Sequence, residues 1–229
     1  MRQTSRRIHA LAHEFLTPLT SIKSAISTVR TEYSHGEEEN EFLTVIEEES
    51  DKLGEMINET ADMARIEPGH PRIRRRRTEV GAIIRSAVQH LKNLLRGRTM
   101  LIDIPERIPE IEADPEMVEL AIRQLIGNAI KYSPPETVIE VRAIYTEGFI
   151  EVQVRDHGAG VPDDEIESIF GRFYRGKRVK EAIAGTGMGL SIARDIVKAH
   201  GGTMWAANAA DGGGCFSFTL PIVPLERTA

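Results

Sequence analysis

Three groups of residues in this chain have types and spacings that can do chemistry, and the first centres on a histidine. His13 is followed by Glu14, Thr17 and Pro18 in the run HEFLTPLT. A neutral imidazole that reaches solvent can attack phosphorus, and an adjoining carboxylate can take the proton from its other ring nitrogen. Pro18 lacks an amide hydrogen, so we expect it to bend a helix just after this turn. Taken alone, such a histidine is most often an ordinary surface residue, which is how we interpret His9.

The second group lies in the run QLIGNAIKYSP. Asn128, Lys131 and Tyr132 fall within about one helical turn, so an amide oxygen for Mg²⁺, a cation for phosphate and an aromatic face share one side. The plainer alternative is that Lys131 favours the helix dipole and that Tyr132 is a half-buried core residue. Both interpretations stay open at this point.

The third group is rich in glycine and comes in two pieces, DHGAG at residues 156–160 and GTGMGL at residues 185–190. Glycines let the backbone approach a ligand closely, and amides at a helix N-terminus attract phosphate. Asp156, at the end of a predicted strand, can accept a hydrogen bond from the exocyclic amine of adenine. Neither piece matches the P-loop or the dinucleotide pattern that follows a first strand. We therefore expect a nucleotide site of another kind.

A helical hairpin must position the histidine. Apolar residues recur at steps of three and four over residues 5–29, which predicts a helix with His13 beside its apolar seam. A turn at 34–36 and a second apolar series over 42–63 predict an antiparallel partner helix. Two such helices leave a wide apolar stripe uncovered, so we expect two hairpins to pair into a four-helix bundle.

A second domain must position the other two groups. Two prolines and a glycine at residues 67–71 stop the second helix and indicate a linker. Residues 157–186 are rich in glycine, proline and charge without periodicity, which is typical of a mobile lid. The remaining pattern predicts an α/β sandwich, with strands near 72–77, 99–104, 110–113, 138–145 and 149–155, helices near 78–96, 114–132 and 190–200, and a final hairpin over 202–220.

Composition narrows the class of protein. The chain has 229 residues and a net charge of -6, which argues against general nucleic-acid binding and makes Arg74 to Arg77 a solvated strand or linker edge. A single cysteine, Cys215, allows neither an intramolecular disulfide nor a cysteine-based metal site, and we expect it to pack in the core. No apolar run of about 18 residues and no secretory signal occur, so we expect a cytosolic polypeptide without membrane contact of its own.

In this order, the groups resemble the sensor histidine kinases of two-component systems over nearly the whole chain. As a set the matching motifs are highly specific. They are the H box at His13-Glu14-x-x-Thr17-Pro18-Leu19, the N box at Asn128-Ala129-x-Lys131-Tyr132, the first glycine box at Asp156-x-Gly158-x-Gly160, the F box at Phe170-x-x-Phe173-Tyr174-Arg175 and the second glycine box at Gly185-x-Gly187-x-Gly189-Leu190. The spellings GTGMGL and HEFLTPLTS also resemble the potassium-responsive sensor group.

The resemblance implies a domain order and an activity. A dimerization and histidine-phosphotransfer hairpin would occupy residues 1–67, a linker 68–71, and a catalytic ATP-binding domain 72–225. That domain would have the two-layer α/β sandwich shared with gyrase, Hsp90 and MutL. The implied reaction is ATP-dependent autophosphorylation of His13 in a homodimer, followed by transfer of the phosphoryl group to an aspartate of a response regulator.

The resemblance also assigns residues. His13, Glu14 and Thr17 would be catalytic, with Thr17 positioning the water that dephosphorylates the regulator. Asp156 would hold adenine, Asn128 and Gln124 would hold Mg²⁺, and residues 162–186 would form the ATP lid. The other residues implied to bind nucleotide are Lys131, Tyr132, Gly158, Gly160, Arg175, Gly185, Thr186, Gly187, Gly189 and Leu190.

Two positions depart from the family pattern. Leu16 stands where the family usually carries a polar residue, which bears on the docking surface near His13. Gln124 stands where Asn or Asp often contacts metal or phosphate, and its longer amide can still reach.

Two other functions would account for part of the pattern. A degenerate kinase would hold ATP and a partner without transfer, but His13, Glu14, Asn128 and Asp156 are all intact. An ATPase of the gyrase or Hsp90 kind would share the glycine boxes but leaves the His-Glu-x-x-Thr-Pro helix unexplained. Because the heptad register already runs from Arg2 to Ile8, we expect a sensor and a membrane segment upstream of this cytoplasmic portion.

Overall fold

The computed structural model describes residues 19–26, 28, 43–46, 49–50, 53–54, 73–95, 97–146, 148–176 and 186–222. The chain divides into two compact units, one of residues 1–62 with 184–186 and the other of the rest. In the first unit, every described residue between 19 and 54 is helical, in agreement with the predicted hairpin helices. The predicted catalytic residues His13, Glu14 and Thr17, and Leu16 with them, lie outside the described residues.

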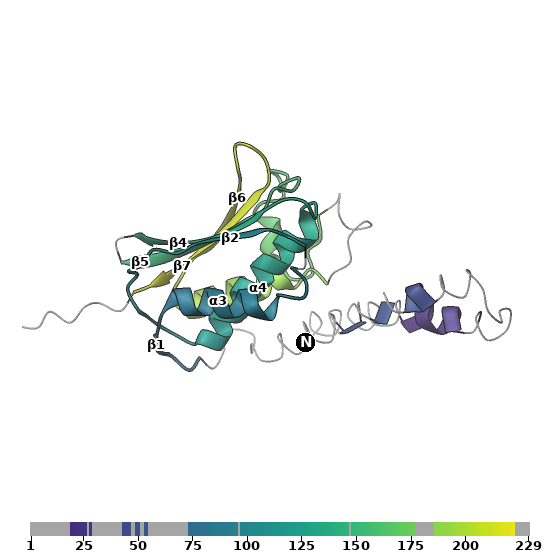
Figure 1. The fold of residues 1–229 in the computed structure, drawn as a ribbon, viewed down its shortest axis with the longest axis horizontal. Helices are drawn as coiled ribbons and strands as arrows, with labels where there is room; N and C mark the ends of the chain where they lie inside the picture. The colour runs from purple at the N-terminus through teal and green to yellow at the C-terminus, as the bar shows by residue number, and fades with distance from the viewer. Residues whose placement is uncertain are drawn as a thin grey trace, which may run out of the picture. The chain divides into compact units, whose positions relative to one another are not determined.

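The second unit is built on a five-stranded mixed sheet (Figure 1). In spatial order its strands are β2 (Met100–Asp103), β4 (Ile139–Thr146), β5 (Phe149–Arg155), β7 (Gly214–Pro221) and β6 (Met204–Asn208). Strand β2 runs parallel to β4, and each other neighbouring pair is antiparallel. Both predicted hairpins are present, as β4–β5 and β6–β7. A separate two-stranded ribbon joins β1 (Arg76–Thr78) and β3 (Ile111–Ala113).

Helices cover one face of this sheet. Figure 1 shows α3 (Val80–His90) and α4 (Pro115–Tyr132) on the same side, and α5 (Gly189–Ala199) packs against α4. Alternate strand residues point to opposite faces, so the buried positions form the core beneath the helices. On β4 and β5 these are Ile139, Val141, Ala143, Ile150, Val152 and Val154. The predicted two-layer α/β sandwich is therefore confirmed.

Some local predictions were wrong. Helix α3 ends at His90 rather than near residue 96, because the chain beyond it has little core to cover and Leu94 is 60% exposed. Strand β1 begins only at Arg76, since the backbone N–H of Arg74 is bonded to the side chain of Asp114. Cys215 is half-buried on the outward face of β7 and is not a core residue.

The arginines from 74 to 77 are exposed, as predicted for a solvated edge. Within the part of the chain that the structure describes, no helix has both the length and the hydrophobicity to cross a bilayer.

Candidate nucleotide-binding site

Helix α4 carries the second predicted group, and a side-chain cap fixes where this helix begins. Asp114 caps the helix by accepting a hydrogen bond from the N–H of Met117 at 3.3 Å, and Pro115 takes the first helical position. Leu125 and Ala129 are fully buried against the core. The polar residues between them are therefore turned away from the core.

A stripe of less buried residues follows this outer side of α4. Gln124, Gly127, Asn128 and Lys131 recur at the i, i+3, i+4 and i+7 spacing of one helix face, and all four are half-buried. A Cβ added at Gly127 would meet nothing within 4 Å, so open space borders the stripe there. Tyr132 follows at the end of the helix and is 38% exposed. The structure thus places Gln124, Asn128 and Lys131 on one face, and it adds Gly127, whose open space sequence reasoning did not single out.

Asp156 lies at the end of β5 and is only 3% exposed. Its Oδ1 accepts hydrogen bonds from the N–H of Gly158 at 2.8 Å and of Gly214 at 3.1 Å. No hydrogen bond from a described residue reaches its Oδ2. Burial raises the pKa of this carboxyl, and the two backbone amides oppose that rise. One oxygen is therefore anchored and the other is available to a donor from a ligand.

Close backbone approach makes glycine necessary on both sides of Asp156. A Cβ at Gly158 would fall under 3.0 Å from the carbonyl oxygen of Tyr132, at the end of α4. A Cβ at Gly213, in the β6–β7 turn, would fall under 3.0 Å from the carbonyl oxygen of Asp156. Three separate segments, the loop after β5, the end of α4 and the β6–β7 turn, can therefore meet around the carboxylate.

Glycines also stand at both ends of the predicted lid. Gly160 has a φ of 69°. The side chain of Asn208 accepts a hydrogen bond from the N–H of the next residue, Val161, at 2.8 Å and donates one to the carbonyl oxygen of Val161 at 2.7 Å. Gly187 has a φ of 71°, and a Cβ there would fall under 3.0 Å from the carbonyl oxygen of Tyr174. Gly160 and Gly187 therefore have defined backbone positions on either side of the predicted lid, whose role stays a prediction.

The segment matching the F box is tied to α5. Phe170, in the short 3₁₀ helix η1 (Ser168–Phe170), is buried and has the guanidinium of Arg194 at 5.4 Å from its ring centre. Arg172 makes an ion pair of 2.6 Å with Asp195. Phe173 has a φ of 63°, the only positive value at a non-glycine residue in the described part of the chain. Such backbone strain concentrates at functional sites.

The N-terminus of α5 faces the stripe of α4. No side chain caps this 11-residue helix at Met188, and its first turn holds no acidic residue. A Cβ at Gly189 would fall under 3.0 Å from Oε1 of Gln124, so the glycine lets the two helices approach. A helix N-terminus with free amides attracts phosphate. Gln124 therefore stands next to the place where phosphate would bind.

The remaining predicted residues are placed as follows. Leu190 lies half-buried in the first turn of α5, and Thr186 comes two residues before its N-cap, Met188. Arg175 is half-buried at the end of the F-box segment, and Gly185 lies outside the described residues.

The donor set fits a magnesium ion held mainly by a nucleotide. Among the residues that the structure describes, no group of three or more His, Cys, Asp or Glu could hold a metal. Asn128 and Gln124 offer amide oxygens on the stripe, and Mg²⁺ commonly takes few protein ligands together with phosphate oxygens and water.

Comparison with known proteins yields two family models. Residues 4–69 match the His Kinase A (phospho-acceptor) domain, and residues 113–224 match the Histidine kinase-, DNA gyrase B-, and HSP90-like ATPase. The first match contains the His13 motif, and the second contains the motifs at residues 124–134, 156–160 and 185–190.

Curated relatives are longer sensor proteins. The sensor protein KdpD of Clostridium acetobutylicum is 28% identical over 96% of this chain, and the sensor protein kinase WalK of Staphylococcus saprophyticus is 29% identical over 98%. The chain spans only 25% of that KdpD and 38% of that WalK. The KdpD match agrees with the resemblance to the potassium-sensor group, while WalK is as similar.

Solved structures share the fold. Histidine kinase ThkA, in complex with response regulator protein TrrA, matches 98% of this chain and 63% of its own with a TM-score of 0.77 at 20% identity. Acinetobacter baumannii histidine kinase AdeS matches 92% of this chain and 98% of its own with a TM-score of 0.70 at 17% identity. Since the two family models together match most of the chain, it belongs to the sensor histidine kinases of two-component systems.

Proposed function

We propose that this chain transfers the γ-phosphoryl group of ATP to His13 and then to an aspartate of a response regulator. The observation that carries the proposal is the half-anchored carboxylate of Asp156, enclosed by glycines, on the same chain as the His13-Glu14-x-x-Thr17-Pro18 motif. The first feature suits adenine and the second suits phosphoryl acceptance. Neither feature alone would require the other.

Nucleotide binding divides among three places in the second unit. The free Oδ2 of Asp156 would accept a hydrogen bond from the amine of adenine. The first-turn amides of α5, at Gly189 and Leu190, would bind phosphate oxygens. Asn128 with Gln124 would hold Mg²⁺, which when bound neutralises charge on the phosphates.

The chemical step falls to the first unit. A ring nitrogen of His13 forms a bond to the γ-phosphorus, the bond from that phosphorus to the bridging oxygen of ADP breaks, and ADP leaves. Glu14 takes the proton from the other ring nitrogen, which makes the imidazole a better nucleophile. Lys131 and Arg175 would neutralise charge that develops on the phosphoryl group.

A homodimer would supply the bundle for this step. Leu19 and Ile26, both in the predicted apolar seam, are 40% and 42% exposed in the single chain. A second hairpin could cover them in a four-helix bundle. Sedimentation should give twice the mass of the 25.5 kDa chain, and Ile26→Glu should lower it to that of one chain.

The central test uses ATP labelled at the γ-phosphate with Mg²⁺. Acid-labile, alkali-stable label should appear on the chain and disappear in His13→Gln, while the matched control His9→Gln keeps it. Acid-labile label on His13→Gln would refute the assignment. Chase with a purified receiver domain should then move the label to the receiver.

A second activity of the same helix concerns the regulator. Thr17 would position the water that hydrolyses the aspartyl phosphate, so Thr17→Ala should slow loss of phosphate from a phosphorylated receiver and leave labelling of His13 intact. Equal slowing of both reactions would speak against this role.

We also propose that the chain is the cytoplasmic portion of a longer, membrane-attached sensor. The support is the length of KdpD and WalK, of which the chain matches 25% and 38%. Fractionation of cells that produce the full gene product tests it, with recovery in the membrane fraction expected.

A further inference from the structure

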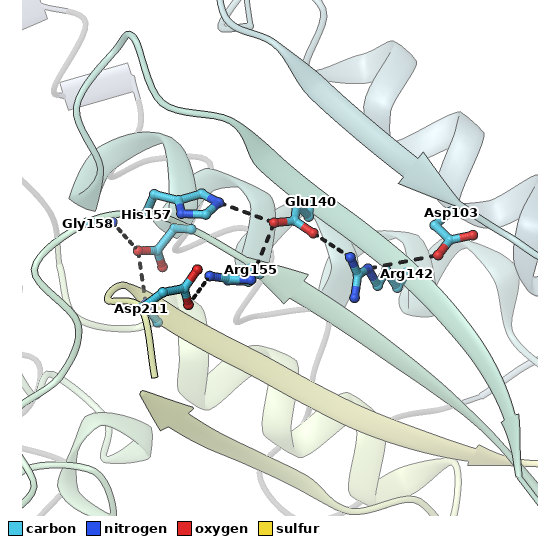
Figure 2. Close-up of polar contacts among 9 residues, drawn as sticks. Asp103, Glu140, Arg142, Arg155, His157, Gly158 and Asp211 are labelled. Carbon is cyan, nitrogen blue, oxygen red and sulfur yellow. Dashed lines mark hydrogen bonds and ion pairs between the residues drawn. The ribbon is translucent and has the colours of Figure 1, made fainter. Parts of the chain in front are cut away.

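A chain of charged side chains on the uncovered face of the sheet plays no part in the proposed mechanism. Its members lie on β2, β4, the end of β5 and the β6–β7 turn, as Figure 2 shows. We call them the outer ladder; they are Asp103, Arg142, Glu140, Arg155, His157 and Asp211.

Glu140 is the hub of the outer ladder. Its Oε2 accepts a hydrogen bond from Nη2 of Arg142 at 2.8 Å. Its Oε1 lies 3.2 Å from Nε2 of His157 and 3.6 Å from Nη1 of Arg155. The side chain of Glu140 is only 13% exposed, so this carboxylate is less screened than a surface ion pair.

The two outer partners of Glu140 flank Asp156 directly in the sequence. Because alternate residues point to opposite faces, Arg155 and His157 turn outward while Asp156 turns inward. Arg155 and Glu140 are also paired across β5 and β4. Thus one carboxylate on the outer face holds both neighbours of the residue proposed to bind adenine.

The outer ladder also includes a residue of the β6–β7 turn, which borders Asp156. Arg155 forms an ion pair with Asp211, and this contact lowers the pKa of Asp211. Asp211 belongs to the turn whose Gly213 packs on the backbone of Asp156, and Gly214, the first residue of β7, donates to Oδ1 of Asp156. Glu140 is therefore linked, directly or through Arg155, to two of the three segments that meet around Asp156, namely the loop after β5 and the β6–β7 turn.

We propose that Glu140 is a positioning residue that sets how strongly the site prefers adenine over other bases. It acts through His157 and Arg155 by fixing where the free oxygen of Asp156 lies. This inference rests on the proposed binding of adenine by Asp156. A small displacement of a hydrogen-bonding group lowers affinity for the ligand that depends on it and spares ligands that do not.

The test measures dissociation constants of non-hydrolysable ATP and GTP analogues with the full chain. Glu140→Ala should weaken binding of the ATP analogue about tenfold and that of the GTP analogue much less, with the rate of His13 labelling at saturating ATP nearly unchanged. The matched control is Asp103→Asn, which alters the outer ladder at its other end, where Oδ2 of Asp103 lies 3.9 Å from Nε of Arg142. This variant should change neither dissociation constant.

A double variant tests whether Glu140 acts through His157. His157→Ala should also weaken binding of the ATP analogue. The double variant should bind the analogue no worse than Glu140→Ala alone, because Glu140→Ala already removes the contact that His157→Ala breaks. Fully additive losses would overturn the mechanism. Equal weakening of both analogues by Glu140→Ala would show a general loss of structure and overturn the proposal.

Failure of the proposed function would look different. If Asp156→Asn kept its preference for the ATP analogue, adenine would be bound elsewhere. If Asp156→Asn lost it while Glu140→Ala kept it, the nucleotide site would stand and the role of Glu140 would be refuted.

Discussion

Asp114 and Asp156, at opposite ends of α4, are almost equally buried and are bonded in different ways. Asp114 is 8% exposed, and its two oxygens accept separate hydrogen bonds, from the N–H groups of Met117 and Arg74. Asp156 is 3% exposed and takes both of its hydrogen bonds on one oxygen. The satisfied carboxylate closes the N-terminus of α4. The half-satisfied one keeps an acceptor for a ligand.

Replacing Asp156 by Asn should have the largest effect, because it removes the free acceptor that distinguishes Asp156 from Asp114. Its carbonyl oxygen would take the bonds from Gly158 and Gly214, which leaves an NH₂ group where adenine needs an acceptor. We expect ATP-analogue affinity to fall about a hundredfold, as measured by calorimetric titration. Retained affinity would contradict the assignment of Oδ2.

In the absence of nucleotide, Asp156→Asn should have a higher free energy of unfolding than the parent chain. Burial raises the pKa of Asp156 in the folded chain above 3.8. The free energy of unfolding therefore falls as the pH rises above 3.8, because the buried carboxyl is harder to ionise than the same group in the unfolded chain. Below pH 3.8 the carboxyl is protonated in both states, and the advantage of Asn should vanish. Urea denaturation of both proteins across this range checks the sign.

Gly158→Ala should affect stability and binding together. The new Cβ would meet the backbone oxygen of Tyr132, which cannot move as a side chain tip can. A loss of about 2–3 kcal/mol is expected in denaturation, with loss of nucleotide binding. The control Gly127→Ala adds a methyl group into open space, so it should gain about 1 kcal/mol as a better helix former yet weaken ATP binding beside Asn128.

Asp114→Ala should show the opposite profile to Asp156→Asn. Loss of the helix cap should cost about 1–2 kcal/mol in chemical denaturation. Affinity for the ATP analogue should stay within about twofold of the parent value, because both oxygens are used inside the protein. A large loss of affinity in a folded variant would show that the two ends of α4 are not separate in function.

The smallest effect expected is a pH dependence from His200. This residue is 2% exposed, with Nδ1 2.8 Å from the carbonyl oxygen of Ile196 and Nε2 3.0 Å from the backbone N–H of Asp114. Nε2 must accept, so the ring is neutral, and burial, with a smaller effect of Arg75, lowers its pKa below 6.5. The unfolded chain then binds the proton first, and stability falls as the pH drops below 6.5 until the folded pKa is passed.

The variant His200→Gln isolates this dependence. Its unfolding free energy should change less than that of the parent chain between pH 8 and pH 5, whatever its stability at pH 8. Identical slopes for the two proteins would show that His200 is not the group responsible.

Much of the second unit followed from local pattern. Alternating apolar residues predicted β4 and β5 almost to the residue, and Glu147-Gly148 predicted the turn between them. Asn128 and Lys131 share a helix face because helical spacing alone requires it. The end of α3 was predicted wrongly because it depends on how far the core extends, which local spacing does not reveal.

The sequence by itself determined which residues could bind a nucleotide and which histidine could accept its phosphate, because those depend on residue type and on spacing within one element. Only the tertiary structure decided which oxygen of Asp156 stays free, that Gln124 meets Gly189, and that Glu140 holds both neighbours of Asp156. Those contacts join elements far apart in the chain, and strand pairing and helix packing, rather than local spacing, bring their atoms together.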